Sequence, residues 1–270
     1  MPTRKKTAAS ASTNTEQLRL RVFAGPNGSG KSTVINYVRQ LKVNGRSVDF
    51  GYYINADDIA VQLTSTGFSF NNFSIKVTKQ EFDETAIASG LINNEFSEKD
   101  FTASYTLRKN GIKLKRPEAN ERLAQIIADF LRKKLLDEKR KFSFETVFSH
   151  HSKLDIMRAA AGAGYKVYLY FVSTESPEIN KFRVEARKKQ GGHDVEPAKI
   201  VSRYYRSLDF LYEASQLAYQ VFFFDNSVDG RDSVMFAHFK IEKGKKKWDP
   251  LDEKIVPGWF KKYYSDKVSK

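Results

Sequence analysis

The residues from Gly25 to Thr33 have the types and spacing that phosphate chemistry requires. They fit the pattern Gly-x-x-x-x-Gly-Lys-Ser/Thr of a phosphate-binding loop. In such a loop, backbone N–H groups surround the phosphates, the lysine (here Lys31) reaches the β- and γ-phosphates, and the hydroxyl of Ser32 is the expected Mg²⁺ ligand. The loop therefore predicts a site for a nucleoside triphosphate. We expect the nucleotide to be bound by Gly25, Pro26, Asn27, Gly28, Ser29, Gly30, Lys31, Ser32 and Thr33.

Two adjacent carboxylates, Asp57 and Asp58, follow the apolar residues 52–54. In a doubly wound sheet, ligands bind outside the carboxyl ends of the strands, so these carboxylates should lie on the same rim as the phosphate loop. One of them could orient or deprotonate an acceptor hydroxyl. The alternative is that one of them only caps the helix that follows.

A group of arginines is the third chemical feature. Arg183 and Arg187 are four residues apart in a predicted helix that runs into Gly191, Gly192 and His193. Such a pair shares one helix face, and guanidinium groups suit the charge that develops on a transferring phosphoryl group. We interpret this stretch as a lid, with Arg203 of the next predicted helix as a second candidate; the alternative is a solvated basic helix.

Two apolar strands carry an acid near their ends. Glu145 stands in the run 142–148, which is otherwise suited to burial, and a buried carboxylate needs a partner or a role. Asp225 ends the run 221–224 and imitates a Walker B acid, but the next residue is Asn226 rather than a second acid. We interpret this run as the last core strand, with Asn226 in a loop near the base of the nucleotide.

The elements that would position these residues alternate between strands and helices. This order predicts an α/β fold of the P-loop kinase type, with a doubly wound, mainly parallel sheet flanked by helices and a helical lid. We expect one domain with appended segments. Its parts are a disordered basic tail (1–16), a kinase domain (17–242) that includes a substrate-side elaboration (67–117) and a lid region (176–206), and a basic, aromatic C-terminal segment packed on the core (243–270).

Composition narrows the class of protein. The formal net charge of +14 favours polyanionic ligands without choosing among them. The absence of cysteine excludes disulfides and zinc–thiolate sites and suits a reducing compartment, so we expect a cytoplasmic protein. No run of 18 apolar residues occurs, and we expect no membrane span.

Taken together, these motifs resemble the zeta-toxin family of P-loop kinases, which includes relatives labelled predicted ABC-type ATPases. The resemblance covers residues 18–227 and rests on the loop Gly25–Thr33, on residues 55–59, 144–146, 183–193 and 224–227. It implies ATP-dependent phosphorylation, which in the characterised toxins falls on a hydroxyl of UDP-N-acetylglucosamine. It also implies that Asp57 is the base, Lys31 the phosphate lysine and Glu145 a substrate-side acid.

The resemblance has two departures. Where the toxins have Glu-Gly-Thr, this chain has Glu145, Thr146 and Val147, so the threonine contact to the substrate is displaced, and residues 67–115 do not match closely. We expect the acceptor to contact Glu145, Thr146, Asp58 and His193, and the catalytic residues to be Asp57, Lys31, Arg183, Arg187 and Arg203. A toxin role would imply an antitoxin partner.

Two other functions compete with a small-molecule kinase. The positive charge and the Lys/Trp/Tyr-rich tail suit a nucleic-acid kinase or a nucleic-acid-stimulated ATPase. A motor-like ATPase is the third hypothesis, and the absence of a Leu-Ser-Gly-Gly-Gln signature counts against it.

Overall fold

The structure is a computed structural model that describes residues 17–191 and 195–268. Its centre is a seven-stranded sheet with the order β12-β11-β10-β9-β1-β8-β4. The strands from β4 to β10 in this order are parallel, whereas β11 pairs antiparallel with β10, and β12 pairs antiparallel with β11. The strands are β1 (Arg19–Ala24), β4 (Tyr52–Ile54), β8 (Phe142–Thr146), β9 (Lys166–Ser173), β10 (Gln220–Asp225), β11 (Val234–Glu242) and β12 (Lys245–Trp248).

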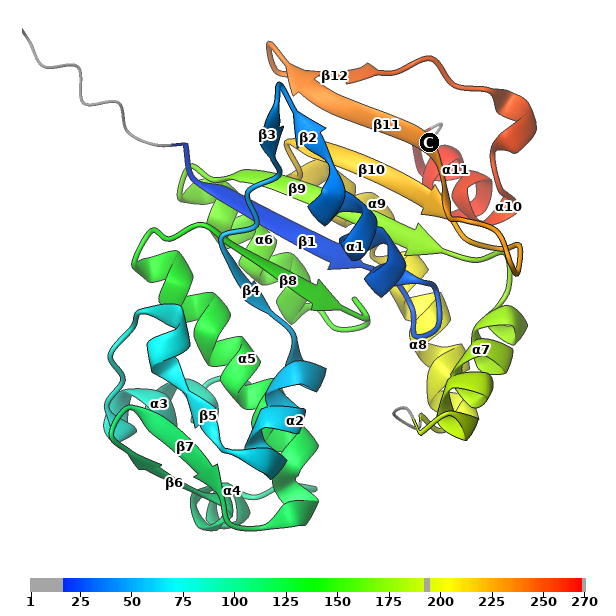
Figure 1. Cartoon of the computed structure of the whole chain (residues 1–270). Coiled ribbons are helices and arrows are strands. Elements are labelled where there is room, and N and C mark those ends of the chain that lie inside the picture. The colour runs from blue at the N-terminus through cyan, green and yellow to red at the C-terminus, as the bar shows by residue number, and fades with distance from the viewer. Residues whose placement is uncertain (1–16, 192–194, 269–270) are drawn as a thin grey trace, which may run out of the picture.

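Helices cover both faces of this sheet (Figure 1). One face is covered by α1 and a small hairpin, and α5, α6 and α9 lie behind the opposite face. The helices are α1 (Lys31–Gln40), α2 (Ala56–Ser65), α3 (Lys79–Ile87), α4 (Glu98–Ser104), α5 (Asn120–Asp137), α6 (Ser152–Gly162), α7 (Pro177–Lys189), α8 (Pro197–Asp209), α9 (Leu211–Leu217), α10 (Gly258–Phe260) and α11 (Asp266–Val268). The predicted α/β fold with a mainly parallel sheet flanked by helices is confirmed.

Shorter elements complete the chain. The hairpin on the α1 face is formed by β2 (Lys42–Val43) and β3 (Arg46–Ser47). A separate three-stranded sheet has the order β5-β7-β6. Its strands and the remaining turns are β5 (Phe68–Ser69), β6 (Tyr105–Arg108), β7 (Gly111–Leu114), η1 (Phe70–Phe73), η2 (Pro117–Ala119), η3 (Glu253–Ile255) and the π-helix η4 (Lys261–Ser265).

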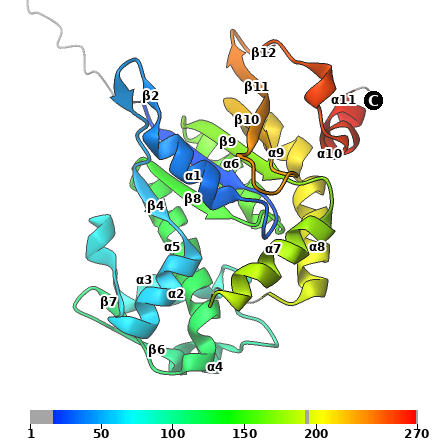
Figure 2. The ribbon, with the colours of Figure 1, turned by 45° about the vertical axis from the view of Figure 1, so that its right-hand side comes forward.

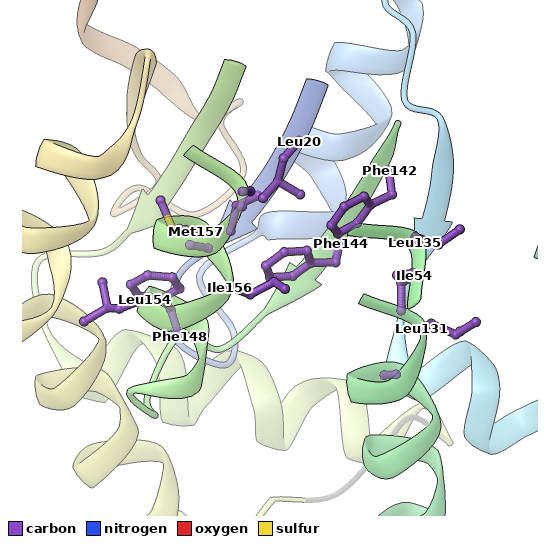
Figure 3. Packing of buried hydrophobic residues seen from close by; sticks show 14 of the residues in the cluster. Leu20, Ile54, Leu131, Leu135, Phe142, Phe144, Phe148, Leu154, Ile156 and Met157 are labelled. Carbon is purple, nitrogen blue, oxygen red and sulfur yellow. The ribbon is translucent and has the colours of Figure 1, made fainter. Parts of the chain in front are cut away.

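The hydrophobic core has two parts because successive side chains of a strand point to opposite faces of the sheet. In β1, Leu20 and Val22 pack on the larger cluster with α5 and α6, whereas Phe23 packs on the smaller cluster with α1. Figure 3 shows the larger cluster between the sheet and these two helices. Its labelled members are Leu20, Ile54, Leu131, Leu135, Phe142, Phe144, Phe148, Leu154, Ile156 and Met157.

The phenylalanines between residues 67 and 117 join the larger core cluster through α5. Phe70 and Phe82 are fully buried, and both rings pack edge-on against Phe130 of α5 at centroid distances of 5.5 and 5.3 Å. At the other end of the main sheet, β11 is second from the edge, because the basic residues of β12 form a further strand outside it. The sequence of β12 is Lys-Lys-Lys-Trp, which gave no alternating apolar signal.

The C-terminal segment lies against the sheet through aromatic side chains. Trp259, Phe260 and Tyr264 are all buried, and the ring centroids of Phe260 and Phe223 of β10 are 4.9 Å apart. The indole N–H of Trp259 donates to Oδ1 of Asp225 at 2.9 Å. Among the helices that the structure describes, none is long and apolar enough to cross a membrane.

A cluster of charges lies between α5 and α6. Asp129 binds Arg132 at 3.0 Å and Lys133 at 2.8 Å, and Lys153 of α6 lies beside them. Burial and the repulsion from Arg132 and Lys133 outweigh the attraction of Asp129, and together they lower the pKa of Lys153 to about 7.

We expect this lysine to make the free energy of unfolding rise with pH above about pH 7. The native state releases the proton near pH 7, whereas the unfolded chain keeps it up to the ordinary lysine pKa of 10.5. The unfolded state therefore binds more protons in this window, and stability increases with pH. Lys153→Met should stabilise the protein most at pH 6, and its advantage should shrink towards pH 9. Urea unfolding of both proteins across this range measures the difference, and parallel pH curves would contradict it.

Candidate functional site

The phosphate loop joins β1 to α1 at the carboxyl end of the sheet, where the sequence placed it. The loop requires glycine at three positions because their φ angles are positive: +148° at Gly25, +75° at Gly28 and +92° at Gly30. Each position is also crowded. A Cβ atom on Gly25 would lie 2.0 Å from the backbone oxygen of Val172 at the end of β9.

The crowding at Gly25 can be separated from its backbone conformation. Gly164 also has a positive φ, +83°, but no atom lies within 4 Å of the position that its Cβ would take. We expect Gly164→Ala to cost about 1–2 kcal/mol of stability through backbone strain alone. Gly25→Ala should cost about 3 kcal/mol and lose nucleotide binding, because its Cβ also meets fixed backbone atoms. Urea unfolding and ADP titration of both variants test this prediction. Equal losses of stability in the two variants would show that the backbone moves to relieve the clash between the new Cβ atom and Val172.

Lys31 lies folded back onto its own loop. Its side chain is 7% exposed, its ammonium donates to the backbone oxygen of Pro26 at 3.0 Å, and Oε1 of Glu145 is 3.9 Å away. Burial lowers the pKa of Lys31, and the charge of Arg187 lowers it further, while Glu145 and Asp57 oppose the shift. Three residues that the sequence predicted for the site, Glu145, Asp57 and Arg187, thus affect the pKa of the Lys31 ammonium group.

Glu145 occupies the strand directly next to the loop strand. In the register between β1 and β8 it is opposite Phe23, and its side chain is 16% exposed. Its Oε2 accepts hydrogen bonds from the hydroxyl of Tyr53 at 3.1 Å and from the amide of Asn55 at 3.3 Å. The partly buried carboxylate in the apolar run therefore has three polar partners, all at the rim that the loop occupies.

Asp57 and Asp58 lie in the first turn of α2, and both are exposed. Neither caps the helix: the cap is Asn55, whose side chain accepts from the backbone N–H of Asp57 at 2.9 Å. Burial raises the pKa of Asp58, and the neighbouring charge of Asp57 raises it further. The alternative that Asp57 or Asp58 only caps the helix is therefore wrong, because Asn55 is the cap. Both carboxylates are available for other contacts.

The three predicted arginines divide into two groups. The charge of Arg187 of α7 contributes to the lowered pKa of Lys31. Burial and Arg206 lower the pKa of Arg203, and Glu121 and Asp57 oppose that shift. Arg183 instead forms an ion pair with Asp229 at 2.5 Å and donates to the backbone oxygen of Asn226 at 2.7 Å. Figure 2 shows α7 and α8, which carry these arginines, beside the loop after β1.

The other residues that the sequence predicted for the site are Thr146, Asn226 and His193. The hydroxyl of Thr146 accepts from the backbone N–H of Phe148 at 3.1 Å, in the loop after β8. Asn226 donates its side-chain amide to the backbone oxygen of Ser29 at 2.9 Å, so it contacts the phosphate loop itself. His193 lies outside the residues that the structure describes.

Asp225 does not have the surroundings of a Walker B acid. Its strand, β10, is separated from β1 by β9. Its carboxylate accepts from the indole of Trp259 at 2.9 Å and from the hydroxyl of Ser227 at 2.8 Å. The strand next to β1 that carries an acid at the rim is β8, with Glu145.

The donor set at this rim fits a magnesium–nucleotide complex. Ser32 is exposed in the first turn of α1 and offers a hydroxyl oxygen, the type of hard ligand that Mg²⁺ prefers. No group of three His, Asp or Glu side chains that could hold a metal occurs in residues 17–191 and 195–268. In the loop, the side-chain oxygens Oδ1 of Asn27 and Oγ of Ser29 are buried without a protein hydrogen-bond partner.

Three residues at this site were not predicted from the sequence as site residues. Tyr53 and Asn55 bind Glu145, and the buried Asn180 of α7 donates to the backbone oxygen of Asn27 at 2.5 Å. Asn55 could have been recognised as a helix cap, because asparagine before two aspartates is a favoured start. No local pattern marks Asn180, which reaches the loop only through the fold.

The chain matches no protein-family model and no curated protein sequence. The solved structures to which the chain is similar include the AvrRxo1-ORF1:AvrRxo1-ORF2 complex with sulphate ions, at 14% identity over 86% of this chain and a TM-score of 0.48. The AvrRxo1-ORF1:-ORF2 complex with ATP has 15% identity over 86% of this chain and a TM-score of 0.45. In both, the match spans 60% of the other chain. The PezAT chromosomal toxin–antitoxin system of Streptococcus pneumoniae has 14% identity over 83% of this chain and 74% of its own, with a TM-score of 0.45.

Proposed function

We propose that the protein is an ATP-dependent kinase of the zeta-toxin type that transfers the γ-phosphoryl group to a hydroxyl of a small molecule. One arrangement supports this most strongly: a lysine of the phosphate loop pairs with an acid of the neighbouring strand, and a second acid and an arginine shift the pKa of that lysine. The second acid also affects the pKa of a second arginine, and the five residues come from five different elements. These residues are Lys31, Asp57, Glu145, Arg187 and Arg203.

Each residue has a defined part in the proposed reaction. The ammonium group of Lys31 donates a hydrogen bond to the carbonyl of Pro26. When nucleotide binds, it would donate to the β- and γ-phosphates instead. Arg187 and Arg203 would stabilise the charge on the transferring group. Asp57 would accept the proton of the acceptor hydroxyl. Mg²⁺, held by Ser32 and the phosphates, would neutralise charge between the β- and γ-phosphates.

The acceptor is the part of the proposal that rests on the sequence resemblance. That resemblance suggests a UDP-amino sugar, and UDP-N-acetylglucosamine is the first compound to test. Glu145 would bind a substrate hydroxyl on the acceptor side, with Thr146, Asp58 and His193 nearby. We further propose that the protein acts in the cytoplasm and that an antitoxin protein binds it.

A screen of acceptors tests the proposal. The protein is incubated with ATP, Mg²⁺ and a panel of UDP-sugars, free sugars and nucleosides, and mass spectrometry identifies any compound that gains a phosphoryl group. We expect one class of hydroxyl compound to be phosphorylated. Slow phosphate release with every acceptor would contradict a kinase and favour an ATPase.

A second candidate, binding of nucleic acid, is favoured by a hollow of about 660 Å³ at the β12 edge of the sheet. Five lysines and Glu242 line it: Lys240, Lys243, Lys245, Lys246 and Lys247. Their charge is partly compensated, because Glu242 binds Lys240 at 3.5 Å and Lys247 at 3.1 Å. Lys246 donates a hydrogen bond to the neutral side chain of Gln216 at 2.9 Å and keeps its charge uncompensated by that contact. RNA or DNA binding that falls steeply with salt would support this candidate; no binding at low salt would remove it.

A further inference from the structure

We propose that Asn180 and Asn226 are positioning residues that hold the phosphate loop in its binding conformation. This inference rests on the proposed nucleotide site and assigns to that site a support that lies outside the loop. Two side-chain amides, one from α7 and one from the end of β10, bind two carbonyl groups of the loop. Asn180 donates to the carbonyl of Asn27 at 2.5 Å, and Asn226 donates to the carbonyl of Ser29 at 2.9 Å.

The geometry of the peptide bond gives these contacts their effect. In a planar trans peptide, the C=O of one residue and the N–H of the next point in opposite directions. Turning the carbonyl of Asn27 towards Asn180 therefore turns the N–H of Gly28 away from it. In the same way, the bond from Asn226 to Ser29 turns the N–H of Gly30 away from Asn226. Backbone N–H groups that point inwards are what a phosphate-binding loop offers its ligand.

The loop glycines are matched to the same two asparagines. A Cβ atom on Gly28 would lie 2.7 Å from the backbone oxygen of Asn180, and a Cβ atom on Gly30 would lie 2.1 Å from Nδ2 of Asn226. The missing side chain of Gly28 thus leaves space for Asn180, which binds the carbonyl of Asn27. The missing side chain of Gly30 leaves space for Asn226, which binds the carbonyl of Ser29. Gly28 and Gly30 are required for the approach of the asparagines as well as for their positive φ angles.

Both asparagines are themselves held by the end of β9, the strand next to β1. The side-chain oxygen of Asn180 accepts from the hydroxyl of Thr174, and the backbone N–H of Asn226 donates to the carbonyl of Ser173 at 2.9 Å. Ser173, Thr174 and Asn180 are fully buried. Arg183, which donates to the carbonyl of Asn226 and pairs with Asp229, completes the support from α7. A buried amide with all its partners in place adds rigidity to the group that it binds.

Amide hydrogen exchange tests the inference without any ligand or activity. Asn180→Ala and Asn226→Ala should each speed exchange in the peptide that covers residues 24–33. Each should also weaken ADP binding about tenfold, because one buried hydrogen bond is lost. Since Asn180 is fully buried, Asn180→Leu serves as a second variant that keeps the size of the side chain and removes the donor to Asn27.

The matched control is Tyr165→Phe. The hydroxyl of Tyr165 donates to the carbonyl of Arg140 at 2.9 Å, another buried side-chain donor to a backbone carbonyl, but at the opposite end of the parallel strands. This variant should lose stability with no change in loop exchange or ADP affinity. Wild-type loop exchange in the asparagine variants would overturn the inference. Wild-type protein that binds no nucleotide would instead contradict the proposed function and leave the exchange comparison valid.

Discussion

Asp57→Asn is expected to lower the rate of phosphoryl transfer by about 10²–10⁴-fold, the range that general-base catalysis contributes, and to leave ATP binding unchanged. Asp57 is exposed in the first turn of α2, and its charge acts on both Lys31 and Arg203. Asp57 therefore acts electrostatically on two of the groups that we propose to bind the γ-phosphate. Asparagine keeps the shape of the side chain and removes the base.

Asp58→Asn is the control for this experiment, because it removes the neighbouring carboxylate of the same helix turn. We expect Asp58→Asn to change the Michaelis constant for the acceptor more than the turnover number. Single-turnover transfer and ATP titration of both variants separate chemistry from binding. Full transfer by Asp57→Asn would assign the base to another residue, with Glu145 as the next carboxylate at this rim.

Lys31→Met is expected to lose about 10²–10³-fold or more in transfer, the cost of removing one donor to a developing charge, without a loss of stability. Burial lowers the pKa of Lys31, which means that the folded state disfavours its charge. Methionine has a similar length and no charge, so this cost of folding disappears. Glu145 would keep its hydrogen bonds from Tyr53 and Asn55. The charge of Lys31 is thus expected to serve phosphoryl transfer at a cost in the free energy of unfolding.

Lys153→Met provides the matched control for Lys31→Met. Lys153 is also a lysine whose pKa is lowered mainly by burial, but it lies between α5 and α6, on the helical layer behind the sheet. Both variants should unfold at a urea concentration at least as high as the wild type at pH 6, and only Lys31→Met should lose transfer. A marked loss of stability in Lys31→Met would show that its contacts with Pro26 and Glu145 outweigh the cost of its burial.

The parts of the site that could be predicted from the sequence are those whose residues are adjacent in the chain. The phosphate loop needs three glycines and a lysine at fixed spacing, and two aspartates directly after a strand must lie at a strand end. The arginines were harder to assign. Arg183 and Arg187 share a helix, but only the fold shows that Arg183 is bound by Asp229 whereas Arg187 acts on Lys31.

The remaining contacts depend on strands that are distant in sequence. Asn180 and Asn226 reach the loop because β9 and β10 end beside it, and the pairing of these strands has no local sequence signal. The order of the sheet also decides that Glu145, rather than Asp225, is next to the loop strand. In the C-terminal segment, Trp248 lies in a strand whose three other residues are lysines, which a search for apolar alternation does not find.

The most direct test of the proposed function is the ratio of ADP formed to acceptor phosphorylated. The protein is mixed with ATP, Mg²⁺ and the compound that the acceptor screen identifies, beginning with UDP-N-acetylglucosamine, and both products are quantified over time. A kinase built from Lys31, Asp57 and the two arginines predicts one phosphorylated acceptor for each ADP, and little ADP when the acceptor is left out. ADP that accumulates at the same rate with and without every acceptor would contradict the proposed phosphotransferase.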